Sequence, residues 1–148
     1  MSNGIKVKKR DGRIESLDLD KMHLMVDEAC QGLAGVSASQ VEMKSGIQFY
    51  DGITTEEIQE ILIKAASDLI DLDHPNYQFV AARLLLFALR KQLYGKMREL
   101  PHLEPHIMNC TNIDVYDKEI FAKYSKEEID KANSFIDHDR DFLFTYAG

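Results

Sequence analysis

Residues 7–21 read VKKRDGRIESLDLDK, a charged hairpin pattern that leads directly into a helix pattern. The dipeptide Asp11-Gly12 lies between two short alternating runs, at 5–9 and 13–17. Asp-Gly supplies the positive φ angles that a tight hairpin turn of the right twist requires. The stretch therefore predicts two short antiparallel strands joined at Asp11-Gly12.

The predicted hairpin has an apolar face and a charged face, because side chains alternate along a strand. An isolated hairpin is marginal in water. We therefore expect it to lie as a flap over the helices that follow. The apolar face is expected to hold Ile5, Val7, Ile14 and Leu17, and the charged face Lys6, Lys8, Arg13 and Glu15.

Helix patterns follow the hairpin. Asp18 is placed to cap the first helix, which we expect to end at Gly35. Ser37 and Thr54 open capping-box patterns for the second and third helices. Pro75 opens the fourth, which is the longest and has the widest apolar face. The second helix is short and is expected to end at Asp51-Gly52. Its expected apolar residues are Val41, Ile47 and Phe49.

The periodicity weakens beyond the fourth helix. Gly95 and Pro101 bracket the expected end of the fourth helix, and Pro105 is expected to keep the next stretch irregular. Two short helices are then predicted at 117–124 and 125–139, the second with a capping box. The aromatic run at 142–146 has no following segment to bury it, and this predicts a docking surface or an interrupted domain.

Composition narrows the class of protein. With 148 residues and 45% hydrophobic content, the chain can bury a core as one domain with an appendage. A net charge of −7 argues against nucleic-acid binding, because domains with that function are basic. Residues 1–21 nevertheless carry six bases and four acids. This locally positive region suits a small anion.

The sequence predicts no metal site and no membrane segment. Cys30 and Cys110 are too far apart to form a metal or redox motif, and two cysteines make no disulfide framework. The histidines lack metal-ligand spacing, because Pro105 interrupts the pair His102 and His106. The sequence has neither the apolar core of a signal peptide nor a run long enough to span a bilayer. We therefore expect a cytoplasmic protein.

Cationic residues surround the predicted turn. A flap that carries Lys8, Lys9 and Arg10 could hold a polyphosphate through charge-assisted hydrogen bonds. Thr55, in the first turn of its helix, could offer its hydroxyl and backbone amide to a phosphate. The residues alone favour simpler roles, because exposed lysines are common and such threonines usually cap helices. The sequence lacks a Walker-type glycine-rich loop, so a nucleotide site here would be of another design.

Motifs spread over the first two thirds of the chain carry a family resemblance. They are KRDG at 9–12, LDLDK at 17–21, YDGITT at 50–55, IKAA at 63–66, YQFVAARL at 77–84 and LRK at 89–91. In this order they resemble the ATP-cone of the large (alpha) subunit of aerobic, class I ribonucleoside-diphosphate reductase. Residues 96–148, with IDHDRD at 136–141, resemble the stretch that leads from the cone toward the reductase barrel.

The resemblance implies the fold class and the domain organisation. The fold is α+β and mainly α, with a small antiparallel hairpin flap over a four-helix bundle at 1–95. Residues 96–148 are implied to form the helical start of a region that leads to an α/β barrel. In the family the catalytic residues lie in that barrel. The resemblance therefore implies part of a thioredoxin- or glutaredoxin-dependent oxidoreductase, in which these residues supply no catalytic group.

The resemblance also implies an allosteric function. In the family the cone binds ATP as activator and dATP as inhibitor, with Mg²⁺, and so controls deoxyribonucleotide synthesis for DNA replication. Lys9 and Lys91 are implied to grip the phosphates, and residues 15–21 to take the adenine and ribose. The implied partners are the remainder of the large subunit, on the same or a separate chain, and the radical-generating small subunit. The implied nucleotide contacts are Lys9, Glu15, Ser16, Leu17, Asp18, Leu19, Asp20, Lys21, Thr55 and Lys91.

Three positions depart from the family pattern. Gln59 and Ala88 stand where some members carry histidine near the nucleotide, and Glu57 stands where many have aspartate. We therefore expect ATP activation with little dATP inhibition. The length also departs, and we interpret the chain as a shortened subunit or as the first piece of a split one.

Two alternatives from other classes stay open. The first is a stand-alone nucleotide-sensing regulator, because ATP-cones also occur in a transcriptional repressor. That repressor family has a zinc ribbon with four cysteines at its N-terminus, whereas the first cysteine here is Cys30. The second is a helical interaction domain without catalysis, which would bind no adenine nucleotide.

Overall fold

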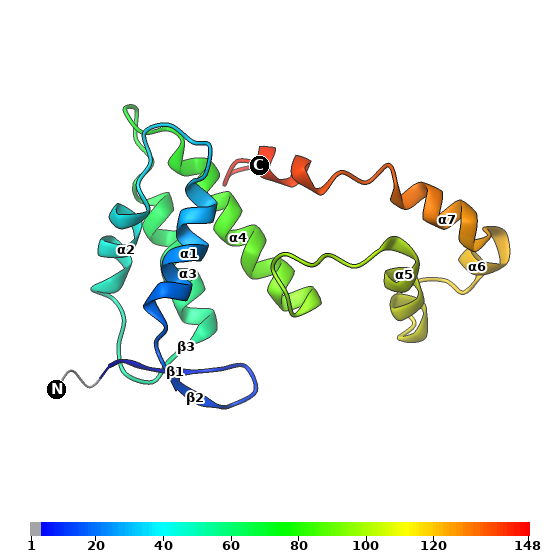
Figure 1. Cartoon of the computed structure of the whole chain (residues 1–148), viewed down its shortest axis with the longest axis horizontal. Coiled ribbons are helices and arrows are strands. Elements are labelled where there is room, and N and C mark those ends of the chain that lie inside the picture. The colour runs from blue at the N-terminus through cyan, green and yellow to red at the C-terminus, as the bar shows by residue number, and fades with distance from the viewer. Residues whose placement is uncertain (1–3) are drawn as a thin grey trace. The chain divides into compact units, whose positions relative to one another are not determined.

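The computed structural model describes residues 4–148 and confirms an α+β chain that is mainly helical (Figure 1). The chain forms two compact units. One comprises the described residues up to Leu89 together with Phe142–Gly148, and the other comprises Arg90–Asp141. Among the described residues, no helix is long and apolar enough to cross a membrane.

A three-stranded sheet contains the hairpin. Strands β1 (Lys6–Lys8) and β2 (Ile14–Ser16) pair antiparallel, which confirms the predicted hairpin. Strand β3 (Ile53–Thr54) pairs parallel with β1 on its other edge. This third strand was not predicted, because so short a strand shows no alternation and overlaps the capping pattern of the next helix.

The hairpin turn differs from the predicted one. Gly12 has a φ of 86°, whereas Asp11 is absent from the described residues with positive φ. The backbone N–H of Gly12 donates to the carbonyl oxygen of Lys9 at 2.9 Å, and that of Lys9 donates to Arg13 at 2.8 Å. The connection is therefore a longer loop with one left-handed glycine at its end, a common hairpin type. The prediction that both Asp11 and Gly12 take positive φ was wrong.

The longer loop also changes which residues share a face. Val7 lies opposite Glu15, and Lys8 lies opposite Ile14. Val7 is only 3% exposed, whereas Ile14 is 69% exposed. Directly opposed residues project from the same face, and a one-residue change of register exchanges the faces. The predicted grouping of Ile14 with Val7, and of Glu15 with Lys8, was therefore wrong.

The helices after the hairpin are α1 (Leu19–Cys30), α2 (Ala38–Gly46), α3 (Thr55–Ser67) and α4 (Tyr77–Tyr94). Helix α2 packs on both α1 and α3. Val7 and Ile53 of the sheet are buried with the apolar helix residues, so the sheet is fixed on the helices. The buried helix residues of this unit include Val26, Ala29, Val41, Ile58, Leu62, Ala65, Ala66, Tyr77, Val80, Ala81, Leu84 and Phe87.

The N-caps confirm two of the three predictions made for these helices. Asp18 caps α1, and Thr54 forms a complete capping box with Glu57 at the start of α3. Ser37 is the N-cap of α2 but makes no capping bond with its side chain. Its backbone N–H donates instead to the hydroxyl of Tyr77 at 3.1 Å, and so it is not available to a residue of α2.

Two helix ends come earlier than predicted. Helix α1 ends at Cys30 rather than near Gly35, because Gly32 already adopts a φ of 72°. Helix α2 ends at Gly46, and Ile47 beyond it is 86% exposed. The prediction that Ile47 faces the core was therefore wrong.

The second unit contains α5 (Leu103–Asn112), α6 (Glu119–Lys123) and α7 (Lys126–Asn133), and the 3₁₀ helix η1 (His138–Leu143) begins in it. Pro105 lies in the first turn of α5, so the prediction of an irregular chain there was wrong. Proline is tolerated in a first turn, since its missing N–H would have no partner within the helix. The capping box of Ser125 with Glu128 is confirmed, although α7 ends before residue 139.

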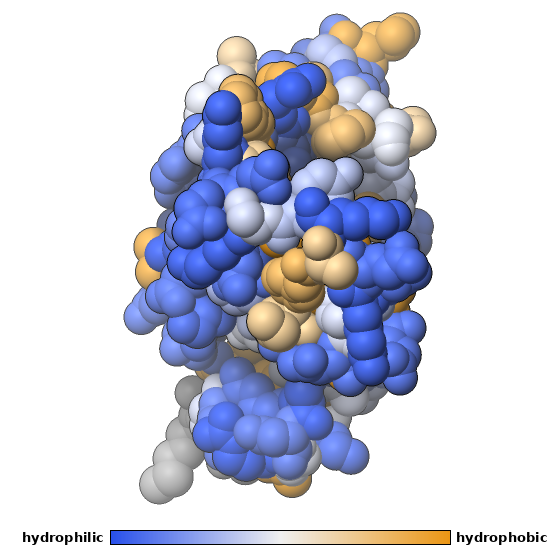
Figure 2. Space-filling view, turned by 90° about the vertical axis from the view of Figure 1, so that its right-hand side faces the viewer, coloured by the Kyte–Doolittle hydropathy of each residue, from blue (hydrophilic) through white to orange (hydrophobic). Residues whose placement is uncertain are grey.

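The aromatic run at 142–146 is partly covered. The ring of Phe142 meets that of Phe87 edge-on, with centroids 6.2 Å apart. Leu143 and Phe144 remain 73% and 62% exposed. Exposed apolar side chains are not confined to this run, and on the face seen in Figure 2 they interrupt a mostly hydrophilic surface. The expectation that nothing covers the run was wrong for Phe142.

Candidate functional site

The hairpin is anchored to the segment that precedes α3. A carboxylate oxygen of Asp51 accepts a hydrogen bond from the backbone N–H of Lys6 at 2.8 Å. The N–H of Gly52 donates to the carbonyl oxygen of Lys6 at 2.9 Å. Asp51 and Gly52 thus satisfy the backbone N–H and carbonyl of Lys6, and β3 continues along the same edge of β1 into α3.

The first turn of α3 is held by a carboxylate network. Glu57 accepts hydrogen bonds from the Tyr50 hydroxyl at 2.8 Å and from the N–H and hydroxyl of Thr54 at 2.8 and 2.9 Å. The backbone hydrogen bond from Thr54, followed by that from Tyr50, lowers the pKa of Glu57. The hydrogen bond from the Tyr50 hydroxyl to Glu57 also raises the pKa of Tyr50. The position of the helix start is therefore determined by side chains as well as by the sheet.

Thr55 is the first residue of α3, at the positive end of the helix dipole. Its hydroxyl donates to the carbonyl oxygen of Lys8 at 3.4 Å, so it lies directly against β1. A helix N-terminus of this kind favours an anion, because its first N–H groups have no partners within the helix.

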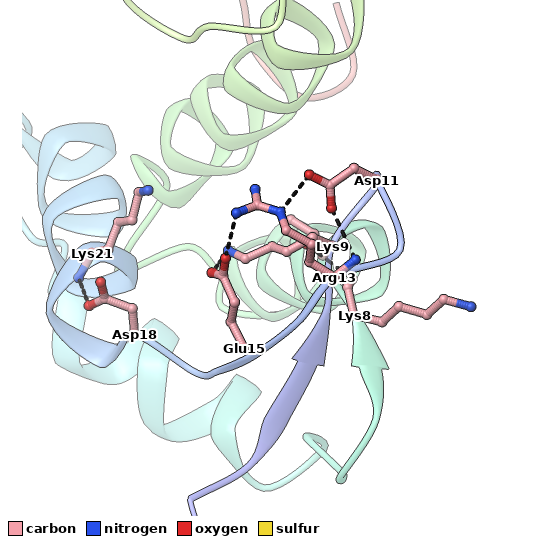
Figure 3. A network of polar contacts seen from close by, with 8 residues as sticks. Lys8, Lys9, Asp11, Arg13, Glu15, Asp18 and Lys21 are labelled. Carbon is pink, nitrogen blue, oxygen red and sulfur yellow. Dashed lines mark hydrogen bonds and ion pairs between the residues drawn. The ribbon is translucent and has the colours of Figure 1, made fainter.

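Charged side chains of the hairpin gather on one face (Figure 3). Lys9 lies 3.5 Å from Glu15, and Arg13 lies 3.1 Å from the same carboxylate. Arg13 also contacts Asp11 at 2.7 Å, and the hydrogen bonds from Arg13 lower the pKa of Asp11. Lys8 extends away from this group in Figure 3, which agrees with its pairing opposite Ile14.

A further ion pair joins the hairpin tip to α3. Nε of Arg10 lies 2.6 Å from a carboxylate oxygen of Glu56, with the side chains 34% and 46% exposed. Sequence reasoning missed this contact, because an acidic residue in a first helical turn is already explained by the helix dipole. It also missed Asp51, which the pattern gave only as a helix breaker.

The segment between the hairpin and α1 has mainly structural contacts. The carboxylate of Asp18 accepts from the backbone N–H of Lys21 at 2.9 Å, and Leu17 N–H donates to the carbonyl oxygen of Ile5 at 2.8 Å. The hydroxyl of Ser16 accepts from Nζ of Lys6 at 3.1 Å. The side chains of Leu19, Asp20 and Lys21 are exposed.

The predicted site residues therefore fall into groups. Lys9 and Glu15 are in contact, and Thr55 contacts the residue that precedes Lys9. Lys91 lies in the last turn of α4, in the second compact unit, and is half-buried. Gln59, one turn beyond Thr55 in α3, is buried with 7% exposure. Among the described residues, no cluster of three or more His, Cys, Asp or Glu could hold a metal ion.

Comparison with known proteins identifies a matching family and several similar proteins. The ATP cone domain family matches residues 5–92. Ribonucleoside-diphosphate reductase 1 subunit alpha of Escherichia coli (strain K12) is 49% identical over 147 residues, which cover 99% of this chain and 19% of that protein. The subunit alpha of Haemophilus influenzae is 47% identical over the same share of each chain. The subunit alpha of Enterobacteria phage T4 is 42% identical over 97% of this chain and 19% of its own length.

These relatives are several times longer, so the chain spans about a fifth of the proteins it matches, 19% of each of these. The family match covers the sheet and helices α1 to α3 entirely, and most of α4. It includes the hairpin, the anchoring segment at 50–52 and the start of α3. The chain therefore belongs to the ATP cone domain family.

Proposed function

We propose that this chain is the allosteric ATP-binding part of a ribonucleoside-diphosphate reductase alpha subunit. The family match over residues 5–92 is the observation that carries the proposal. Thr55 contacts the carbonyl oxygen of Lys8, the residue before Lys9, and this supports a nucleotide site between the hairpin and α3. The relatives' names support the assignment to the reductase.

The phosphates of ATP or dATP bind between the hairpin and the start of α3 in this proposal. Lys9 supplies a positive charge that a ligand can reach from solvent, since its side chain is 29% exposed. Thr55 supplies a hydroxyl and the positive end of a helix. Lys91 enters the proposal from the sequence resemblance alone.

The adenine and ribose are assigned to residues 15–21. The Glu15 carboxylate is 43% exposed and can accept hydrogen bonds from ribose hydroxyls. The carboxylate of Asp18 is engaged in capping α1, so its role is to position Leu19, Asp20 and Lys21. We assign Mg²⁺ to the phosphate oxygens, since the described protein residues offer no cluster for it.

The binding event regulates an enzyme of which this chain is one part. We propose cytoplasmic action, with the remainder of the alpha subunit and a radical-generating subunit as partners. Reduction of ribonucleoside diphosphates is assigned to the remainder. A helical interaction domain is the competing function, and it predicts no binding of adenine nucleotides.

Calorimetric titration with ATP tests the proposal. Each charge-assisted bond to phosphate contributes about 1.5–3 kcal/mol. Lys9→Ala or Lys91→Ala should therefore weaken binding by at least about tenfold. Lys64→Ala is the matched control, because Lys64 lies on the exposed side of α3 and pairs with Asp68 at 3.2 Å. Unchanged affinity in both test variants would remove the proposed site, and no ATP binding at all would favour the interaction domain.

A further inference from the structure

Two cations of the hairpin tip, Lys9 and Arg10, are already paired with carboxylates of the chain itself. Arg10 contacts Glu56 at 2.6 Å, and Lys9 contacts Glu15 at 3.5 Å. Glu56 directly follows Thr55, so its carboxylate occupies the positive end of α3 where an anion is favoured. A phosphate that approached Thr55 would meet this carboxylate and the guanidinium that it holds.

The pairs are placed so that an incoming anion can replace them. The Arg10 and Glu56 side chains are 34% and 46% exposed, and ion pairs with such access to solvent are individually weak. A polyphosphate carries several charges and can bind a guanidinium through two parallel hydrogen bonds. The exchange therefore favours the polyphosphate, but its net gain is reduced by the pair that must be broken.

We propose that Glu56 is an internal competitor that sets the affinity of the site for polyphosphates by holding Arg10 at the end of α3. The inference rests on the proposed function and names the residue that regulates it. In the nucleotide-free chain Glu56 neutralises Arg10. On binding, the phosphates take its place on the guanidinium, and the Glu56 side chain turns to solvent.

A double-mutant cycle tests this role in the full 148-residue chain. ATP and inorganic tripolyphosphate are titrated into the wild type, Glu56→Gln, Arg10→Gln and the double variant. Glu56→Gln should tighten binding of both ligands by about two- to fivefold, the range expected for an exposed ion pair. The gain should vanish when Arg10 is already Gln, because Glu56 acts through Arg10. Glu60→Gln is the matched control, since it removes the same charge one turn further along α3 at an exposed position.

The outcomes separate the two proposals. Failure of the wild type to bind ATP overturns the proposed function. If the wild type binds ATP and Glu56→Gln binds equally or more weakly with an intact circular dichroism spectrum, Glu56 is not a competitor. An equal gain in Glu56→Gln and Glu60→Gln overturns it as well, because the effect would then be only net charge. A gain that persists in the Arg10→Gln background shows that the carboxylate does not act through Arg10.

Discussion

Replacement of Thr54 by alanine should destabilise the first compact unit through the start of α3. The Thr54 hydroxyl accepts from the backbone N–H of Glu57 at 3.1 Å and donates to the Glu57 carboxylate at 2.9 Å. Loss of an N-cap side chain of this kind costs about 1 kcal/mol, within a range of about 0.5–2 kcal/mol. For a unit of roughly this size, 1 kcal/mol lowers the melting temperature by about 4–8 °C.

The chain offers a matched control for this variant. Ser37 is the N-cap of α2 but makes no capping bond with its side chain. Ser37→Ala should therefore lower the melting temperature by much less than Thr54→Ala does. Thr54→Ser keeps the capping hydroxyl, so its melting temperature should stay close to that of the wild type. Thermal and urea unfolding followed by circular dichroism measure all three. Equal losses in Thr54→Ala and Ser37→Ala would refute the reasoning, because the observed hydrogen bonds would then carry no measurable stability.

Three further predictions concern the Cys30 thiol, the Glu57 carboxylate and the response to dATP. Burial raises the pKa of the half-buried Cys30 thiol to about 11, and Asp27 adds to the effect. In a Cys110→Ser variant, alkylation of Cys30 at about pH 8 should therefore be far slower than alkylation of a cysteine in an exposed peptide. The lowered pKa of Glu57 contributes stability that is present above its unfolded pKa of about 4.3 and is lost as pH falls through the folded value. The free energy of unfolding should therefore fall less steeply with decreasing pH in Glu57→Gln than in the wild type, and an unchanged pH dependence would contradict this. A reductase assembled with this chain should be activated by ATP and little inhibited by dATP, because Gln59 and Ala88 stand where histidines in some family members could donate hydrogen bonds to a phosphate. Strong dATP inhibition in an activity assay would show that these positions do not disable the switch.

The sequence patterns correctly predicted the features that depend on interactions between residues close together in the chain. Gly12, Asp18 and the Thr54–Glu57 box are short-range features, and the structure places them as a turn residue and two caps. The exposure of Ile14 was not accessible in this way, because it depends on a loop one residue longer than the tight turn that Asp-Gly favours. The same is true of β3, which exists only because β1 supplies a partner edge.

The candidate site likewise contains residues that the sequence named and a contact that only the structure shows. The sequence resemblance named Lys9, Glu15 and Thr55, and the structure brings the first two into contact. It could not name the Arg10–Glu56 pair, which joins residues far apart in the sequence across two elements. Contacts of this kind depend on the register of the hairpin, and the register was the part of the hairpin that the sequence pattern predicted wrongly.

The base of the hairpin is held by buried apolar side chains, whereas its tip is held by partly exposed ion pairs, and this difference bears on how a nucleotide could act. Val7 and Ile53 are 3% and 0% exposed and lie opposite each other in the sheet. The ion pairs of the tip are partly solvated and contribute little stability. A ligand shifts an equilibrium only by its different affinity for two states. ATP bound at the proposed site would therefore have to distinguish states that differ at the tip and at the first turn of α3. The base connects that turn to the helices through β3, and Glu56 is the residue placed to couple the tip to α3.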